Sequence, residues 1–301
     1  MSNNFIKFRD IASHDIQSVL DRATEMKAGM VSNALVGKSV AILFEKPSLR
    51  TKLSFWIGIQ KLAGSPVYFG PEEVGLGTRE PVADVANVMS RLSDIIVIRT
   101  FLQSTIEEFA ANASVPVINA LSDHEHPCQA LADVLTITEA LGTVAGGKVA
   151  FIGDGNNVAL SLGYAVAGLG GQLQIASPDG YKLSSDSLDG ANAYGEHMGG
   201  SVDQVSNPLE AVANADIVYT DVWTSMGQET ESAERIEAFE GYQVNPGVLD
   251  EASPNVKFMH DLPAHPGEEI SDGLLYDPRS IVFDQAENRL WAQAALMEKL
   301  V

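Results

Sequence analysis

Short apolar runs alternate with longer amphipathic stretches along nearly all of the 301 residues. The stretches 81–92 and 126–141 have apolar residues at the spacing of a helix. Strands that alternate with helices form parallel sheets, because each helix carries the chain back to the same end of the sheet. The sequence therefore predicts an α/β protein with doubly wound parallel sheets flanked by helices. The runs expected as strands are residues 39–44, 94–98, 115–119, 148–153, 172–176, 215–220 and 256–260.

The Gly-rich segment 142–148 is the best candidate for a domain boundary, because it separates a long predicted helix from a new strand. We expect a first domain over residues 1–141 and a second over 142–284, each with its own central parallel sheet. The C-terminal helix, 285–301, is expected to pack back on the first domain. Two such domains facing each other would place an active site in the cleft between them, at the carboxyl ends of the strands.

The net charge of −21 makes nucleic acid and anionic membranes poor partners, because a negative field repels both. No apolar run is long enough to span a membrane, and the N-terminus lacks the apolar core of a secretory signal. The one cysteine, Cys128, excludes an intrachain disulfide and fits a reducing compartment. We therefore expect a cytoplasmic protein. An anionic substrate would need local cations, so an arginine inside a polar motif is informative.

The segment PSLRTK places such an arginine directly after the first predicted strand. Ser48 can cap the helix that follows, and the first backbone N–H groups of a helix form a ready anion site. Arg50 adds a fork that matches phosphate oxygens, and Thr51 adds a hydroxyl. The plain alternative is a serine cap followed by two surface cations. The glycines of a P-loop are absent.

The segment DHEHPCQ begins another helix, with Pro127 at its first position and His126 at its mouth. A neutral imidazole here can donate a hydrogen bond to a carbonyl oxygen. His124, His126 and Cys128 match no standard zinc spacing, so we expect no metal.

The segment FIGDGNN resembles part of a dinucleotide-binding loop, but Val158 stands where its third glycine belongs. Asn156 and Asn157 can cap the next helix, or they can hold a carboxylate or an amino group. Two more predicted strands end in acids, Asp221 and Asp261. Ligands of α/β proteins bind at such strand ends, so an ordinary series of turns is the less favoured interpretation.

The motifs SLRT, IRT, HPCQALAD, GDGNN, DVWTSMGQE, HDLPAH and ENR occur in an order that resembles the aspartate/ornithine carbamoyltransferase family. The Ser-Met-Gly loop with its preceding aspartate resembles the ornithine branch. The resemblance implies transfer of the carbamoyl group of carbamoyl phosphate to the δ-amine of L-ornithine, giving L-citrulline and phosphate, as in arginine biosynthesis. It also implies an N-terminal domain for carbamoyl phosphate, a C-terminal domain for the amino acid, no cofactor, and homotrimers or multiples of trimers.

The same resemblance implies a role for each matching residue. The four implied catalytic residues are Thr51, Arg99, His126 and Asp261. The implied carbamoyl phosphate contacts are Ser48, Leu49, Arg50, Thr51, Gly75, Arg99, His126, Pro127, Cys128, Gln129, Asp261, Leu262 and Arg289. The implied ornithine contacts are Asn157, Asp221, Ser225 and Met226. Closure of the 224–228 loop is expected to exclude water.

Three positions depart from the usual family motifs: Leu49 replaces a threonine, Gly75 a glutamine and Asp261 a cysteine. Asp261 bears most on the amine substrate. One alternative is therefore a transcarbamylase for a related amine, such as putrescine or an acylated ornithine, although Asp221 favours a free α-amino group. Another is a nucleotide-binding oxidoreductase built on GDGNN, against which the missing third glycine counts.

Overall fold

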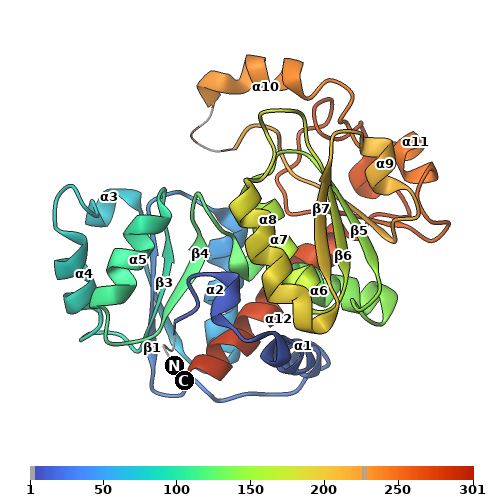
Figure 1. The fold of residues 1–301 in the computed structure, drawn as a ribbon. Helices are drawn as coiled ribbons and strands as arrows, with labels where there is room; N and C mark the ends of the chain where they lie inside the picture. The colour runs from blue at the N-terminus through green and yellow to red at the C-terminus, as the bar shows by residue number, and fades with distance from the viewer. Residues whose placement is uncertain (1–3, 226, 228) are drawn as a thin grey trace. The chain divides into compact units, whose positions relative to one another are not determined.

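The computed structural model describes residues 4–225, 227 and 229–301. The chain divides into two compact units, one with the residues up to Leu135 together with Glu287–Val301, the other with Thr136–Ala286. Each unit has its own parallel β-sheet between layers of helices (Figure 1). The α/β class with two parallel-sheet domains, as the sequence predicts, is therefore confirmed.

The first unit contains a four-stranded sheet in the order β2-β1-β3-β4, with all neighbours parallel. Its strands are β1 (Ser39–Phe44), β2 (Ser65–Phe69), β3 (Ile95–Arg99) and β4 (Val117–Leu121). Its helices are η1 (Phe8–Asp10), α1 (Ser13–Lys27), α2 (Leu49–Lys61), α3 (Pro71–Val74), α4 (Val82–Met89) and α5 (Gln103–Asn112), with the first part of α6 (Pro127–Leu141) and most of α12 (Val282–Leu300).

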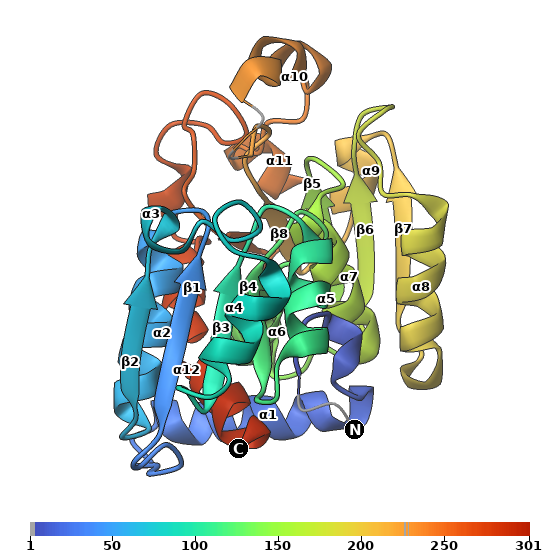
Figure 2. The ribbon, with the colours of Figure 1, turned by 90° about the vertical axis from the view of Figure 1, so that its left-hand side faces the viewer.

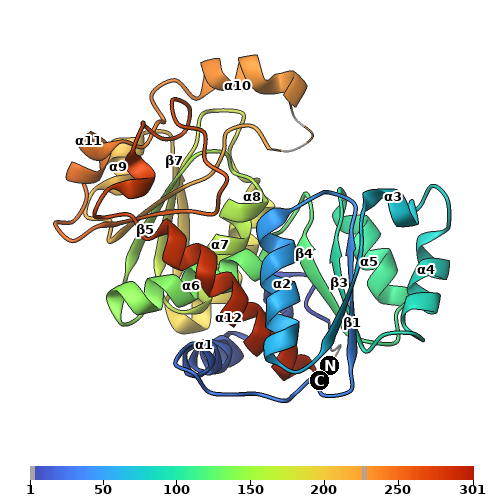
Figure 3. The ribbon, with the colours of Figure 1, turned by 180° about the vertical axis from the view of Figure 1, so that it is seen from behind.

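Helices cover both faces of this sheet, with α4 and α5 on one face and α2 on the other (Figures 1 and 3). Side chains alternate between the faces of a strand, so every second residue of β1 and β3 points toward α4 and α5. These residues are buried and form one apolar core with the inner faces of both helices: Ala41, Leu43, Ile96, Ile98, Val85, Ala86, Ile106 and Phe109. This face of the sheet is therefore packed against α4 and α5 through a continuous apolar core.

The second unit contains a five-stranded sheet in the order β7-β6-β5-β8-β9, again parallel throughout. Its strands are β5 (Lys148–Ile152), β6 (Gln172–Ala176), β7 (Ser201–Val205), β8 (Ile217–Thr220) and β9 (Lys257–His260). Its helices are α7 (Asn157–Gly168), α8 (Ser185–Gly195), η2 (Glu196–Met198), α9 (Pro208–Val212), η3 (Glu229–Glu231), α10 (Ser232–Ala238), α11 (Pro246–Asp250) and η4 (Leu274–Tyr276).

In this sheet α7 and α8 lie on one face, whereas α9 and α11 lie on the other (Figures 1 and 3). Every residue of α7 from Val158 to Gly168 is buried, as expected for a helix that is apolar all round. The arrows of each sheet point the same way in Figure 2, so the carboxyl ends of neighbouring strands meet at one edge.

Two strands, β2 and β7, are not predicted by the apolar pattern of the sequence, and both lie at the edge of their sheet. β2 has the sequence SPVYF, in which Pro66 cannot donate to a strand ladder. β7 has the sequence SVDQV, in which Asp203 is exposed and Ser201 and Gln204 are half-buried. A strand at the edge of a sheet has only one neighbouring strand and fewer buried residues. Its sequence is therefore less apolar and is harder to predict as a strand.

Candidate active site

Three strands of the first unit end level with one another. The register pairs Phe44 of β1 with Arg99 of β3, and Arg99 with Leu121 of β4. The segments that leave β1 and β4 begin helices at Leu49 and Pro127 respectively. The parallel topology thus brings the PSLRTK segment, Arg99 and the HPCQ segment to one edge of the sheet, where α/β proteins bind ligands.

The start of α2 has the cap that the sequence predicts. Ser48 is extended, with φ −158°, and its side chain accepts a hydrogen bond from the Thr51 amide at 3.3 Å. Thr51 is 1% exposed, and its hydroxyl accepts a hydrogen bond from Nη2 of Arg289 on α12. Leu49, by contrast, is 76% exposed, so the residue that departs from the family motif presents an apolar side chain to solvent.

The start of α6 also follows the prediction, with Pro127 as its first residue. His126 and Gln129 are buried beside it, and the Gln129 amide donates to the His126 carbonyl at 3.0 Å. Cys128 is fully buried and its thiol donates to the carbonyl of Asn119. Burial raises the pKa of Cys128 to about 12, so it is a neutral thiol at physiological pH.

Gly75 lies at the end of α3, where the backbone is left-handed with φ +60°. A Cβ at this position would lie 2.9 Å from Cβ of Arg79. The local turn therefore explains why glycine replaces the usual side chain here. The side chain of Arg79 is largely exposed to solvent. Its guanidinium makes one long hydrogen bond, to the carbonyl of Glu73 at 3.4 Å.

Three strands of the second unit likewise end level. Ile152 of β5 pairs with Thr220 of β8, and Thr220 pairs with His260 of β9. Asn156 caps α7 by accepting from the amides of Val158 and Ala159, while Nδ2 of Asn156 donates to Asp221 at 2.8 Å. Asn156 therefore caps α7, as predicted, and also contacts a carboxyl group of the protein itself, whereas ligand binding by this pair of asparagines stays a prediction.

Asp221 and Asp261 interact directly at this edge. Burial raises the pKa of Asp221 well above its usual range, and the charge and hydrogen bond of Asp261 raise it further. The pair therefore retains a proton at a pH where an exposed carboxyl has lost it. An approaching ammonium group would favour the ionised form, because opposite charges attract.

His260 lies close to the two aspartates and is completely buried. Its Nε2 is 3.1 Å from Glu269 Oε1 and its Nδ1 is 3.5 Å from Asp261 Oδ1. Burial lowers the pKa of His260, but hydrogen bonds to Asp261 and Glu269 outweigh it and raise the pKa to about 9. The Leu262 amide also donates to Nδ1 at 2.9 Å, which requires a neutral ring. The Asp261 carboxyl group and the Leu262 amide thus compete for Nδ1.

The stability of the second unit should depend on pH through His260. A pKa of about 9 in the folded state exceeds the ordinary value of about 6.5. The stabilisation is therefore complete below about pH 6.5 and is lost as the pH rises through about 9. Asp261→Asn removes a carboxylate that raises this pKa, so the variant should lose less stability over this range, and the loss should end at a lower pH. Urea unfolding of both proteins from pH 6 to 10 measures this, and superimposable pH profiles would show that Leu262 keeps the ring neutral.

Arg235 of α10 connects two loops of the second unit. Its Nη1 donates to Asp154 at 2.7 Å and to the carbonyl of Trp223 at 3.0 Å. Asp154 belongs to the GDGNN segment, and Trp223 precedes the Ser-Met-Gly loop. The buried guanidinium therefore holds the two motifs at a fixed spacing. Ser225 is half-buried, whereas Met226 lies outside the described residues, as does Gln228 of the loop expected to close.

Gly155 of the GDGNN segment is explained by packing within the chain. A Cβ at Gly155 would lie 2.4 Å from the backbone nitrogen of Leu183, and the Gly155 amide donates to the Tyr181 carbonyl at 2.7 Å. Packing within the chain therefore requires a glycine at this position without any bound dinucleotide. The partial glycine motif thus gives no support to the oxidoreductase alternative.

Several side chains at these edges are absent from the predicted set. Asn156 is one of them, and its side chain contacts Asp221. The buried partners His260 and Glu269 complete the aspartate cluster. The sequence HDLPAHPGEE contains both residues, but only the tertiary fold shows that the chain turns back between them, so that two side chains nine positions apart come into contact.

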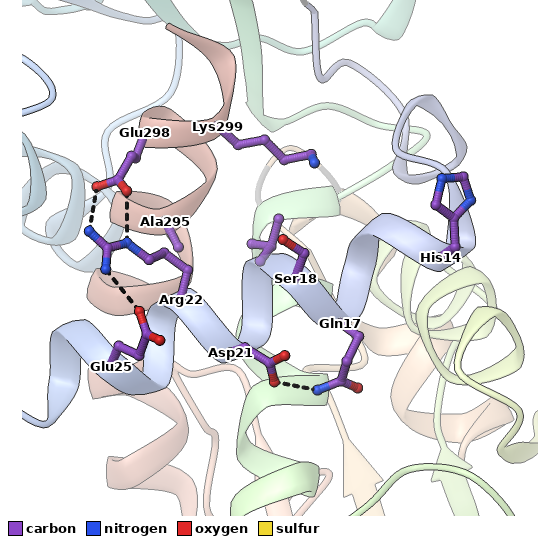
Figure 4. Close-up of a pocket in the computed structure, with 10 residues that line it drawn as sticks. His14, Gln17, Ser18, Asp21, Arg22, Glu25, Ala295, Glu298 and Lys299 are labelled. Atoms are coloured by element: carbon purple, nitrogen blue, oxygen red, sulfur yellow. Dashed lines mark hydrogen bonds and ion pairs between the residues drawn. The ribbon is translucent and has the colours of Figure 1, made fainter.

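A hollow of about 650 Å³ lies on α1 and the end of α12, at some distance along the sequence from every predicted site motif except ENR (Figure 4). Its charged groups already pair with one another: Arg22 donates to Glu298 at 2.7 Å and to Glu25 at 2.8 Å. Gln17 similarly donates to Asp21. None of the predicted site residues lines it, so we do not assign the active site here.

The carboxyl ends of the two sheets carry different groups, arginines near capped helix starts in the first unit and a largely buried pair of aspartates in the second. A family model for the carbamoyl-phosphate-binding domain of aspartate/ornithine carbamoyltransferase matches residues 3–139. A second model, for the Asp/Orn-binding domain of that family, matches residues 145–300. The chain belongs to the aspartate/ornithine carbamoyltransferase family, and it is a carbamoyltransferase.

Individual relatives agree with the family models over the whole chain. An ornithine carbamoyltransferase of Bacillus subtilis is 45% identical over 298 residues, which cover 99% of this chain and 93% of the relative. The anabolic ornithine carbamoyltransferase of Pseudomonas aeruginosa is 46% identical, covering 99% and 97%. The solved structure of the Pyrococcus furiosus ornithine carbamoyltransferase has a TM-score of 0.94 at 42% identity, covering 98% and 96%. None of the helices in the described parts combines the length and hydropathy needed to cross a bilayer.

Proposed function

We propose that this enzyme transfers the carbamoyl group of carbamoyl phosphate to the δ-amine of L-ornithine and releases L-citrulline and phosphate. The observation that carries the proposal is the level ending of β1, β3 and β4, which gathers a capped helix start, Arg99 and His126 at one edge. The names of the most similar relatives support ornithine as the amine. The anabolic name of one relative supports a role in arginine biosynthesis.

The phosphate of the first substrate fits the start of α2. Free N–H groups and the helix dipole favour an anion there, and Arg50 supplies a guanidinium one residue inside the helix. Ser48 and Thr51 contribute the cap and a hydroxyl, while Arg289 holds that hydroxyl in place. We propose that these groups bind the phosphate in the substrate and stabilise it as a leaving group. By resemblance, Gly75 belongs to a loop that completes the site.

The carbamoyl group fits the buried donors beside this helix start. Attack by an amine places negative charge on the carbonyl oxygen, and fixed donors in a water-poor site stabilise that charge. Arg99 and His126 are 7% and 3% exposed, so neither needs to be drawn out of water when the charge develops. We propose that these two side chains and the Thr51 hydroxyl polarise the carbonyl, while Pro127 and Cys128 fix the backbone at this point.

The amino acid fits the edge of the second unit. We propose that Asp221 binds the α-ammonium group of ornithine and that Asn157, Ser225 and Met226 complete the contacts. Asp261 and Leu262 would lie near the reacting δ-amine. That amine must be neutral to attack, and with a pKa of about 10.4 only on the order of one molecule in 10³ is neutral at pH 7. A carboxylate stabilises the ammonium form, so Asp261 should bind the cation better than it activates the nucleophile.

The amine substrate is tested by citrulline-type product formation with carbamoyl phosphate and a panel of amines. L-Ornithine should give the highest kcat/KM, while putrescine and Nα-acetyl-L-ornithine should be poor substrates because each lacks the α-ammonium group that Asp221 is proposed to bind. A preference for putrescine or the acetylated amine would replace ornithine with that substrate and remove the proposed role of Asp221. We expect activity without an added cofactor or metal.

We expect a homotrimer or a multiple of trimers. The family resemblance places the counterpart of the 72–81 loop in a neighbouring subunit's site, and in this chain residues 77–81 are exposed. Light scattering coupled to an activity assay of the eluted protein measures the assembly. A fully active monomer would contradict the expectation and leave the loop without a function. The cytoplasmic location stays a prediction.

A further inference from the structure

A buried carboxylate, Asp133, lies one turn along α6 from Gln129. The spacing of four residues places both side chains on the same face of the helix. Nε2 of Gln129 donates to Oδ1 of Asp133 at 2.9 Å. Asp133 is 0% exposed and Gln129 is 1% exposed. A buried carboxylate is costly unless hydrogen bonds compensate it, so the contact needs an explanation beyond helix packing.

This contact fixes the orientation of the Gln129 amide. The side-chain NH₂ group of Gln129 donates to Asp133, so the carbonyl oxygen of the same planar amide is turned away from Asp133. Oε1 of Gln129 is buried and has no hydrogen-bond partner among the residues that the structure describes. Gln129 therefore presents one oriented acceptor in an environment with little water. Such an acceptor favours a ligand that brings its own N–H donor.

We propose that Asp133 is a positioning residue that holds the Gln129 carbonyl oxygen toward the NH₂ group of carbamoyl phosphate. The inference rests on the proposed function and on the family resemblance, which implies that Gln129 contacts carbamoyl phosphate. It adds a basis for substrate selection, since acetyl phosphate has nearly the same shape but carries a methyl group instead of NH₂. The methyl group would leave the buried oxygen without a donor. A site built around such a hydrogen bond rejects an analogue that lacks it.

Two stable phosphonates separate this role from a structural one. Phosphonoacetamide carries the NH₂ group and acetonylphosphonate carries the methyl group, while both keep the phosphonate and the carbonyl. Calorimetric titration of the full-length protein with each gives a selectivity ratio that needs no turnover. We expect the wild-type enzyme to bind phosphonoacetamide roughly 10- to 10²-fold more tightly.

Asp133→Leu removes the acceptor at similar volume, so phosphonoacetamide must then orient Gln129 when it binds. Ordering one long side chain should reduce the selectivity roughly 3- to 10-fold. Asp133→Asn satisfies both orientations of the Gln129 amide, so the reduction should be only about twofold. This nearly isosteric variant also provides the test if Asp133→Leu does not fold. Gln129→Met should abolish the selectivity.

Thr136→Val is the matched control, because Thr136 is a buried polar residue of the same helix. It should leave the selectivity unchanged even if it lowers stability. An equal loss of affinity for both phosphonates in the Asp133 variants would indicate a structural role and overturn the inference. Unchanged selectivity in those variants, with selectivity lost in Gln129→Met, would overturn it as well. Binding of neither phosphonate by the wild-type protein would instead refute the proposed carbamoyl phosphate site.

Discussion

Arg99→Met should lower kcat roughly 10²- to 10³-fold, the loss typical for removal of one donor to a developing oxyanion. Arg99 ends β3, is 7% exposed and is aligned with the ends of β1 and β4. Its guanidinium is therefore positioned before the substrate binds. Methionine has a similar length and fills the same space, so the sheet should remain intact. Steady-state kinetics with saturating carbamoyl phosphate and ornithine measure the effect.

Arg91→Met is the control, because it removes the same charge from an exposed position of the first unit. Its kcat should stay within about twofold of the wild-type value, as expected for a distant surface charge. Added guanidinium should restore part of the activity of Arg99→Met. The circular dichroism spectrum of this variant should match that of the wild-type protein, which would show that the fold is intact. Wild-type kcat in Arg99→Met would show that the carbonyl oxygen is polarised elsewhere.

Arg50→Ala should weaken carbamoyl phosphate binding roughly 10- to 10²-fold. A hydrogen bond to a charged group contributes about 1.5–3 kcal/mol, which corresponds to this range. Arg50 is half-buried in the first turn of α2, where the helix dipole adds to its charge. Isothermal titration with carbamoyl phosphate, or with phosphonoacetamide as a stable substitute, gives the dissociation constants directly.

Lys61→Ala provides the matched control on the same helix. Lys61 is exposed in the last turn of α2, so its removal changes the net charge equally but leaves the helix start intact. Its affinity for the ligand should be unchanged within about twofold, since salt screens a charge at that distance. Equal losses in both variants would mean that net charge, rather than the Arg50 fork, determines the affinity.

At the carboxyl end of the first unit's sheet, much could be predicted from local sequence, because caps and helix starts depend on neighbouring residues. Ser48 does cap α2 and Pro127 does begin α6, each as its motif indicates. The central strands were equally accessible, since burial on both faces makes them continuously apolar. The edge strands β2 and β7 were not, because Pro66 and the polar residues of β7 are tolerated only at a sheet edge.

The arrangement of side chains at the carboxyl end of the second unit's sheet depends more on contacts between segments that are distant in the sequence. Asn156 meets Asp221 across 65 residues, and Arg235 meets Asp154 across 81. Neither pair can be predicted from the sequence, because asparagine, aspartate and arginine are also common as helix caps or surface residues. His260 and Glu269 are buried together, yet both side chains would be expected at the surface by composition alone. Asp261 is therefore understood only together with its neighbours Asp221 and His260.

The most direct test of the central claim is to measure citrulline and inorganic phosphate in the same samples of purified protein, with carbamoyl phosphate and L-ornithine supplied together and separately. The proposed function predicts that both products form in a one-to-one ratio when both substrates are present, and that Arg99→Met slows the two equally. Citrulline should be absent when either substrate is omitted. Phosphate release that does not depend on ornithine, or no citrulline from the wild-type protein at saturating substrates, would contradict the assignment.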